Sequence, residues 1–212
     1  MLLEQKKFTK HFSTPIMHFH FPEHEPLNQE LLKEGAKMRK ESEGITKSNR
    51  GGWHSAGNLY KNTAPSIKIL RALSEECVNA CMKKVGAKAD LTKLDMELYA
   101  WMNVNPVMGF NAPHTHPGAH WSGVYYISQP EIEEGNSGMI EFLNPRTDLP
   151  NWRILDIPAF GSKTKFRPKP GEMILFPSYL MHWVYPNETD QERVTVAFNA
   201  TFKKKKKSKE KA

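Results

Sequence analysis

Three histidines and one arginine, in two segments far apart in the chain, combine the residue types of a metal site and an anion site. His114 and His116 open the run HTHPGAHWSGVYYI, and His182 is followed eleven residues later by Arg193. Imidazoles at positions i and i+2 of a strand point to the same side. The pair therefore offers one face of a metal site, which a third imidazole from a distant strand would complete. A guanidinium group beside it is suited to binding a carboxylate through two parallel hydrogen bonds.

The second segment predicts a hairpin that positions its histidine. In PGEMILFPSYLMHWVYPN, Gly171 ends a turn, EMILF is an apolar strand, Pro177 closes that strand and His182 begins the next one. In the following run RVTVAFNATF, Arg193 and Thr195 share a face by the period of two. A guanidinium and a hydroxyl on one strand face form a carboxylate clamp, and an arginine buried without an anion would be costly.

From residue 95 on, the chain consists of short aromatic and β-branched segments separated by Gly, Pro and Asn. The segments are MELYAWMNV, HWSGVYYIS, GMIEFLN, WRILDI, KTKFRP, EMILFP, HWVYP and ERVTVAFNATF. Seven or eight such segments, spaced by about a dozen residues, are typical of a β-sandwich or barrel. Strands and helices do not alternate, which argues against a parallel α/β sheet. We therefore expect a mainly β fold, a barrel or jelly roll, on which two helices pack.

The two helices are predicted in the N-terminal part, at residues 27–43 and about 65–86. Asn28 is a candidate N-cap of the first helix and Gly44 a candidate stop. Pro65 lies in the first turn of the second helix, where proline is favoured.

Two other N-terminal segments are polar or broken by turn residues. The run PIMHFHFPEHEP alternates and then breaks at prolines, which predicts an edge strand. Its His18 and His20 have no distal partner motif, so a metal role is not favoured for them. The run SNRGGWHSAGNLY, residues 48–60, is predicted to be a loop. We expect a supporting region at 1–94, a catalytic core at 95–202 and a disordered lysine-rich tail at 203–212.

The net charge of +7 is concentrated in the tail. The residues after Phe202 contain seven lysines and one glutamate, a net charge of +6, so the remainder of the chain carries only +1. We expect the tail to be solvated. The rest of the sequence contains no second basic patch interleaved with aromatic residues. We therefore expect no nucleic-acid partner.

The rest of the composition favours a soluble protein of a reducing compartment. The two cysteines, Cys77 and Cys81, lie four residues apart on the second predicted helix and are expected to be reduced. No apolar run reaches membrane-spanning length, and the first residues lack the apolar stretch of a signal peptide. We therefore expect a cytoplasmic protein without a membrane partner.

Three segments together resemble the 2-oxoglutarate/Fe(II)-dependent oxygenases. More narrowly, they are similar to a small bacterial and phage-type group with an SNxGGW segment, an HxHP segment leading into SGVYY, and an FPSxLxH…RxT segment. Here they read SNRGGWHS (48–55), HTHPGAHWSGVYYI (114–127) and FPSYLMHWVYPNETDQERVTVAFN (176–199). The resemblance extends from about residue 11 to 202.

The resemblance implies a double-stranded β-helix, which is a jelly roll of cupin type. It also implies an Fe(II) cofactor and 2-oxoglutarate as the co-substrate. Oxidative decarboxylation to succinate would then be coupled, with dioxygen, to hydroxylation of a small-molecule or peptidyl substrate. His114 and His182 match metal ligands. Arg193 matches the residue that binds the distal carboxylate of the co-substrate, with Thr195 assisting.

His116 departs from the family pattern, because its position normally holds a carboxylate. Three neutral imidazoles would leave the metal more positive by one charge, although iron would still bind. We favour His116 as the third ligand, with Glu141 and His120 as open alternatives. Tyr126 shares strand parity with Val124 and either reaches the co-substrate or is a core aromatic residue.

A second function is compatible with the same histidines. His114, His116 and His120 have the spacing of a first cupin motif, and His182 fits the second. Such a protein would be a three-histidine dioxygenase or an isomerase that does not use 2-oxoglutarate, and the Arg193-x-Thr195 pair argues against it. A third class is a non-catalytic binding or structural module with a jelly roll. The intact set of His114, His182 and Arg193 disfavours it.

Overall fold

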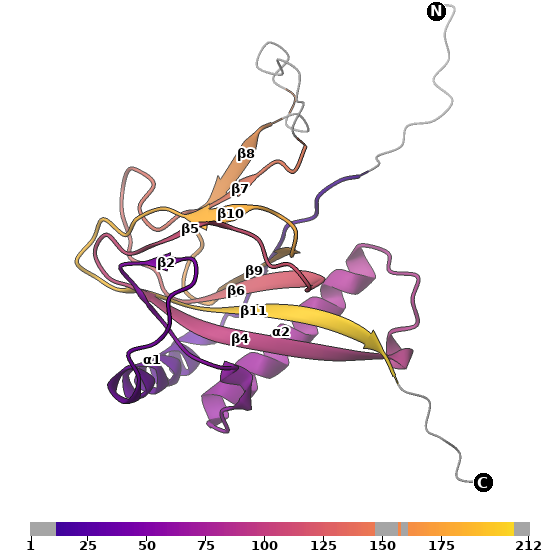
Figure 1. The fold of residues 1–212 in the computed structure, drawn as a ribbon, viewed down its shortest axis with the longest axis horizontal. Coiled ribbons are helices and arrows are strands. Elements are labelled where there is room, and N and C mark those ends of the chain that lie inside the picture. The colour runs from indigo at the N-terminus through magenta and orange to yellow at the C-terminus, as the bar shows by residue number, and fades with distance from the viewer. Residues whose placement is uncertain (1–11, 147–156, 158–160, 206–212) are drawn as a thin grey trace, which may run out of the picture.

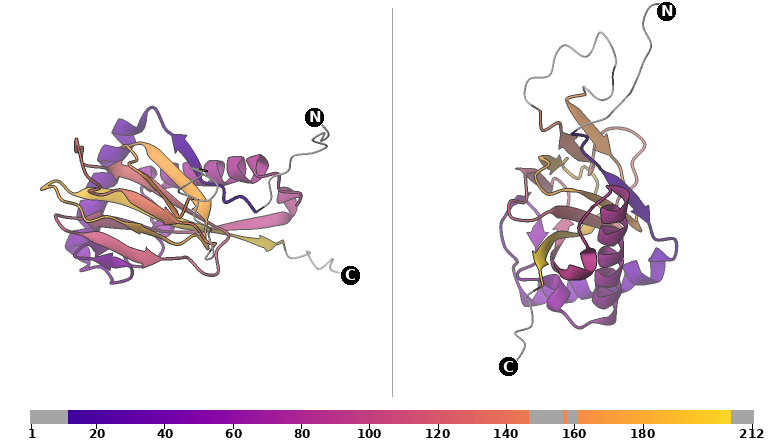
Figure 2. Two further views of the ribbon diagram at one scale, coloured as in Figure 1. Left: turned by 90° about the horizontal axis from the view of Figure 1, so that it is seen from above. Right: turned by 90° about the vertical axis from the view of Figure 1, so that its right-hand side faces the viewer.

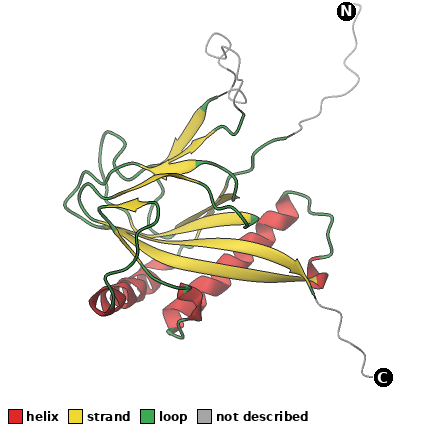
Figure 3. Cartoon of the chain, viewed as in Figure 1, coloured by secondary structure: helices red, strands yellow, loops and turns green. Residues whose placement is uncertain are grey.

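The computed structural model describes residues 12–146, 157 and 161–205, and it consists of three layers (Figures 1 and 3). Two antiparallel sheets face each other, and two helices cover the outer face of the larger sheet. The larger sheet has the strand order β1-β9-β6-β11-β4-β3 and the smaller β2-β5-β10-β7-β8. This arrangement confirms the predicted mainly β jelly roll with two packing helices.

The helices are α1 (His24–Glu41) and α2 (Pro65–Lys84), with short 3-10 turns at η1 (Leu59–Lys61) and η2 (Leu91–Lys93). The strands of the larger sheet are β1 (Met17–His20), β3 (Trp53–His54), β4 (Leu94–Asn105), β6 (Trp121–Ser128), β9 (Glu172–Pro177) and β11 (Arg193–Lys204). Those of the smaller sheet are β2 (Asn49–Arg50), β5 (Phe110–His114), β7 (Ile140–Leu143), β8 (Lys163–Phe166) and β10 (His182–Val184).

Strands of the larger sheet supply two hydrophobic cores, one from each face. Tyr125 and Ile127 of β6 pack with the helices, whereas Val124 and Tyr126 of the same strand pack toward the smaller sheet. Successive side chains of a strand point to opposite faces. Because both faces are covered, apolar residues occupy both sets of positions, which explains the unbroken apolar run VYYI.

One predicted helix cap has a different role. Helix α1 begins at His24, and Asn28 lies buried within it rather than at its start. The Asn28 Nδ2 donates to the backbone oxygen of Ile127 at 2.9 Å, and the Tyr125 hydroxyl donates to Asn28 Oδ1 at 2.7 Å. The N-cap prediction is therefore wrong, and Asn28 instead joins α1 to β6. Pro65 does occupy the first turn of α2, as predicted.

The segment predicted to be a loop at 48–60 contains strands β2 and β3, so that prediction is wrong in part. Strand β2 pairs with β5 and strand β3 with β4, so the chain passes from the smaller to the larger sheet between them. The two glycines make this passage possible. Gly51 has a φ of +66°, and a Cβ on Gly52 would lie 2.7 Å from the backbone oxygen of Val104. The predicted edge strand is confirmed, because β1 forms one border of the larger sheet.

The remaining predictions concern the ends of elements. The segment WRILDI falls almost entirely on residues outside the described part of the chain. The first two residues of the predicted tail, Lys203 and Lys204, belong to β11. The tail from residue 206 on lies outside the described part of the chain. The division at residue 94 stays a prediction. Cys77 and Cys81 are free thiols, as expected. None of the described helices is long and apolar enough to cross a membrane. Figure 2 shows that β4 and β11 form a long ribbon leading to the C-terminus.

We expect Asn28→Ala to lower the free energy of unfolding by about 1–3 kcal/mol, because the Tyr125 hydroxyl and the Ile127 carbonyl lose their buried partner. Urea unfolding measures this change. The exposed neighbour Gln29 provides the control, and Gln29→Ala should change stability by less than about 0.5 kcal/mol. In the double variant with Tyr125→Phe, the loss should be smaller than the sum of the single losses. Additive losses would contradict the assigned hydrogen bond.

Candidate metal centre and anion site

Three imidazoles converge where the smaller sheet faces the larger one. Strand β10 pairs with β5 so that His182 lies directly opposite His114, and their ring centroids are 4.3 Å apart. The His116 ring centroid lies 4.9 Å from that of His114 and 5.2 Å from that of His182. One ring nitrogen from each residue lies within 4.8 Å of the others. Three nitrogens at this spacing can share one metal ion.

His116 reaches the cluster from a loop rather than from a strand. Strand β5 ends at His114, and the backbone N–H of His116 donates to the Ser178 oxygen at 2.9 Å. The Ser178 N–H in turn donates to the His120 oxygen at 3.2 Å, which holds the loop against the turn after β9. The expectation that both imidazoles lie on one strand face is therefore wrong, although the structure does bring the two rings together.

Backbone carbonyls orient two of the imidazoles. The Nδ1 of His114 lies 2.7 Å from the Ala112 oxygen, and the Nδ1 of His182 lies 2.8 Å from the Leu180 oxygen. A carbonyl only accepts, so each Nδ1 carries the hydrogen and each Nε2 keeps its lone pair. A hydrogen bond from the ring nitrogen that does not bind the metal is the usual way in which a metal-binding histidine is oriented.

Burial keeps the three imidazoles neutral. Desolvation and the neighbouring His114 lower the pKa of His116 to about 4. Desolvation, with His114 adding to it, lowers the pKa of His182 well below its ordinary value, and desolvation also lowers the pKa of His114. Neutral imidazole is the form that binds metals, so all three residues are in the required state at neutral pH.

A buried positive charge lies in the same cavity. Arg193 and Thr195 of β11 line it together with the three histidines, and Arg193 is only 1% exposed. The guanidinium donates to two neutral oxygens, Gln129 Oε1 at 3.1 Å and Asn105 Oδ1 at 3.5 Å. No carboxylate in the described part of the chain pairs with it. Burial lowers the pKa of Arg193, which expresses the cost of this unpaired charge.

Two buried polar atoms next to this charge have no hydrogen-bond partner among the described residues, Tyr126 Oη and Asn103 Oδ1. Thr195 lies between them, because it is the cross-strand neighbour of both residues. Burial raises the pKa of Tyr126 to about 12, against the opposing effect of Arg193, so its hydroxyl remains a donor. The Arg193 Cζ lies 5.2 Å from the Tyr126 ring centroid. Unpartnered polar atoms around a buried guanidinium fit the binding of an anion.

Sequence reasoning missed several cavity residues. Four of them are Ser48, Trp101, Asn103 and Asn111. Their signal was weak. Trp101 and Asn103 share one face of β4 by the period of two, Asn111 lies on a strand that was not predicted, and Ser48 precedes the glycine pair. Trp101 also contacts a candidate ligand, with its ring centroid 5.5 Å from that of His116.

The two alternative third ligands lie elsewhere. The Glu141 carboxylate accepts hydrogen bonds from Trp183 Nε1 at 3.1 Å and from the Tyr185 hydroxyl at 2.8 Å, and it pairs with Lys163 at 3.1 Å. His120 Nδ1 accepts from the backbone N–H of Phe202 at 3.2 Å. Neither residue belongs to the imidazole cluster.

One family model matches part of this chain. Residues 99–199, just under half of the chain, match the family described as "Putative 2OG-Fe(II) oxygenase". This match confirms the resemblance to the 2-oxoglutarate/Fe(II)-dependent oxygenases. Fe(II) and 2-oxoglutarate, expected from the sequence, are the cofactor and co-substrate of that class, and the cluster of neutral imidazoles beside a buried guanidinium fits them. No curated protein matches this chain in sequence.

Solved structures support the fold. A prolyl-4-hydroxylase from Pseudomonas putida superposes with a TM-score of 0.63 at 13% identity, covering 89% of this chain and 93% of that chain. HygX from Streptomyces hygroscopicus, with nickel, 2-oxoglutarate and hygromycin B bound, gives 0.60 at 11% identity, covering 89% and 83%. A prolyl hydroxylase from Trichoplax adhaerens, in complex with a hypoxia inducible factor peptide fragment, gives 0.59 at 12% identity, covering 88% and 83%.

The lowered histidine pKa values predict how the metal-free protein responds to pH. Between about pH 6.5 and 4 the unfolded chain binds more protons than the folded one, so the free energy of unfolding falls as the pH decreases through this window. His116→Asn removes one of these groups and should flatten the dependence by up to about 1.4 kcal/mol per pH unit. Urea unfolding in the presence of a chelator measures it. Equal flattening by His20→Asn, on the exposed part of β1, would contradict the assignment.

Proposed function

We propose that this chain is a hydroxylase in which His114, His116 and His182 bind Fe(II). Arg193, with Thr195 and Tyr126, binds the distal carboxylate of 2-oxoglutarate. The observation that carries the proposal is the buried, carboxylate-free guanidinium in the same cavity as three neutral imidazoles. Fe(II) with its co-substrate supplies dioxygen activation coupled to oxidative decarboxylation.

The protein's own residues position the co-substrate and exclude water. Gln129 and Asn105 hold the guanidinium of Arg193 in place through neutral oxygens, which leaves its charge for an incoming anion. The Tyr126 hydroxyl, which remains protonated, is available as a further donor. Because the cavity lies between the two sheets, the interactions inside it are stronger than in bulk water.

The three-histidine ligand set has an electrostatic consequence. A cavity that holds a divalent cation and Arg193, and no carboxylate, carries three positive charges. A dianion compensates most of this charge, so metal and co-substrate binding should reinforce each other. This supports a co-substrate that brings both negative charges, as 2-oxoglutarate does.

The substrate class stays open between a small molecule and a peptide. Two of the solved neighbours are named as prolyl hydroxylases, whereas another holds hygromycin B. The alternative, a three-histidine cupin-type enzyme that does not use 2-oxoglutarate, is not better supported. The match of residues 99–199 to the oxygenase family favours the 2-oxoglutarate interpretation over this alternative.

Arg193→Met tests the co-substrate site. We expect anaerobic addition of Fe(II) and 2-oxoglutarate to the wild type to give a visible metal-to-ligand charge-transfer band, and aerobic turnover to form succinate. The variant should bind 2-oxoglutarate at least about 30-fold more weakly, because it loses a charge-assisted pair worth about 2–5 kcal/mol. Its folding stability should not fall greatly, because the variant no longer buries an unpaired charge.

The control for this variant is Arg71→Met, which removes an exposed ion pair with Glu75 on α2. It should retain the band and the affinity. A wild-type protein that binds iron tightly but shows no band with 2-oxoglutarate would favour the cupin-type alternative.

A second comparison identifies the third ligand. His116→Asn should weaken Fe(II) binding at least about 100-fold, because even indirect supports of a metal site are worth 10- to 100-fold. His120→Asn and Glu141→Gln should leave Fe(II) affinity within about threefold of the wild type, because both side chains lie outside the cluster. Competition with a chromophoric chelator measures the affinities. Loss of binding in either of the latter variants would reassign the third ligand.

A further inference from the structure

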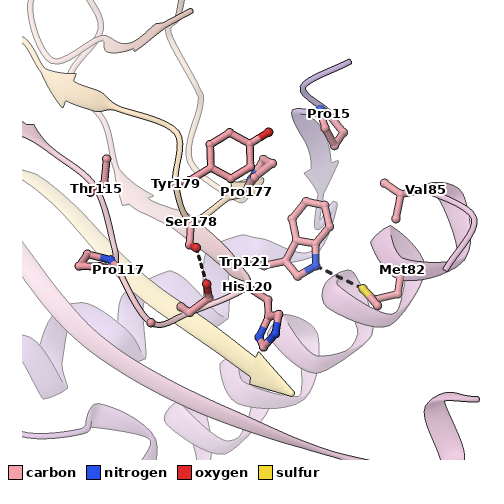
Figure 4. Close-up of a pocket in the computed structure, with 12 residues that line it drawn as sticks. Pro15, Met82, Val85, Thr115, Pro117, His120, Trp121, Pro177, Ser178 and Tyr179 are labelled. Carbon is pink, nitrogen blue, oxygen red and sulfur yellow. Dashed lines mark hydrogen bonds between the residues drawn. The ribbon is translucent and has the colours of Figure 1, made fainter. Parts of the chain in front are cut away.

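A second concave surface lies beside the metal centre. It is a groove of about 770 Å³ whose walls come from the end of α2, the loop after β5, the turn after β9 and the segment before β1 (Figure 4). Its lining is mostly apolar and rich in proline. The lining residues are Pro15, Met82, Val85, Thr115, Pro117, Gly118, Ala119, His120, Trp121, Pro177, Ser178 and Tyr179. Tyr179 is 56% exposed and Val85 41% exposed, so two large side chains of the groove face solvent.

The groove shares a loop with the candidate metal site. Thr115 and Pro117 line the groove on either side of His116, whose ring belongs to the imidazole cluster. The same loop is held by hydrogen bonds to Ser178, which also lines the groove. A molecule in the groove therefore lies along the segment that presents a candidate metal ligand.

An open sheet edge begins next to this groove. Strand β11 pairs with β4 along its whole length but with β6 only as far as Ala200. Beyond that point, the His120 side chain accepts the N–H of Phe202, and the period of two directs the N–H of Lys204 to the same edge. No strand in the described part of the chain covers the edge from Phe202 to Lys204. Such an edge accepts an extended peptide as an added strand.

The surroundings of the groove and the edge are positively charged. Residues 83–97 and 203–205 contain seven lysines and three acidic residues, a net charge of +4. Two of the acidic residues are engaged, because Asp90 pairs with Lys93 and Glu97 with Lys203. Five lysines form no ion pair within the described ranges: Lys83, Lys84, Lys88, Lys204 and Lys205.

The kind of partner follows from this charge and the lining. The basic segments 83–97 and 203–205 contain lysines but no arginine, the residue best suited to phosphate recognition. Lysines of this kind fit the carboxylates of a polypeptide. The open backbone edge fits a main chain, which a nucleic acid does not offer. The apolar lining requires apolar side chains between the acidic ones.

We propose that the groove and the open edge of β11 form a docking site for an extended, acidic segment of a polypeptide substrate. The segment pairs its backbone with the edge at Lys204, beyond the Phe202 N–H that His120 occupies. It places its carboxylates near the lysines and inserts apolar side chains beside Tyr179 and Val85. The assignment of this partner as the substrate rests on the proposed oxygenase function. A neighbouring part of the same polypeptide then reaches the metal centre across the loop that carries His116.

The test measures binding of a fluorescent random copolymer of glutamate and tyrosine to the full chain, without metal or 2-oxoglutarate. Fluorescence anisotropy should show binding, and the double variant Lys83→Glu with Lys84→Glu should weaken it at least about tenfold. The matched control is Lys37→Glu with Lys40→Glu, which makes the same charge change on exposed positions of α1. It should change the affinity less than about threefold.

Two further comparisons separate the groove and the edge from charge alone. Tyr179→Ala should weaken binding of the glutamate–tyrosine copolymer but not that of polyglutamate. Lys204→Pro should weaken binding more than Lys204→Ala, because only the proline also removes the backbone donor at the edge. Circular dichroism and urea unfolding confirm that each variant is folded.

Three outcomes would overturn the proposal. Equal loss in the α1 control would mean unspecific attraction, and tighter binding of oligouridylate, lost in the same lysine variant, would assign the surface to nucleic acid. Absence of binding would remove the docking site. Failure of the oxygenase proposal is distinguishable, since it would leave copolymer binding intact while the charge-transfer band and succinate formation are absent.

Discussion

The burial of one positive charge without a negative partner is the interaction on which the site depends. Arg193 lies between two sheets, and its hydrogen-bond partners are neutral oxygens. Desolvation of a charge is among the most expensive terms in folding unless it is compensated. The surrounding fold must therefore be stable enough to offset that cost. The cavity residues around it, which include three neutral imidazoles, supply no negative charge.

The larger sheet can carry the cost of this buried charge because its two faces differ in composition. One face of β4, β6 and β11 builds the cavity, and the other forms the core with α1 and α2. The core against the helices contains most of the fully buried aliphatic side chains, whereas the cavity side has polar residues such as Asn103 and Thr195. The apolar area buried against the helices offsets the polar groups on the cavity side. The hydrogen bonds of Asn28 join α1 to β6, a strand whose side chains contribute to both faces.

Much of this arrangement could be predicted from the sequence, because strand periodicity is a strong signal. The period of two places Arg193 and Thr195 on one face, and the run from Gly171 to His182 indicates a hairpin. Both features appear in the structure. The position of His116 was predicted for the wrong reason. Its ring reaches the cluster through backbone hydrogen bonds to Ser178, a residue more than sixty positions away, and sequence spacing contains no information on such a contact.

The parts that could not be predicted are short or ambiguous. Strands β2 and β3 have two residues each and are separated by two glycines, a pattern that reads as a loop. Strand β5 contains Pro113 and was not recognised, so the inward position of Asn111 was missed. Asn28 has the residue type of a helix cap, but tertiary contacts with β6 decided its role. In each case a long-range contact outweighed the local preference.

The pairing of His114 with His182 also bears on how the chain holds together. These residues are 68 positions apart, yet they face each other across two neighbouring strands. An ion held by both would act as a cross-link that closes a long loop, and the entropy removed from the unfolded chain grows with the length of that loop. Occupancy of the site and resistance to denaturation would then rise together.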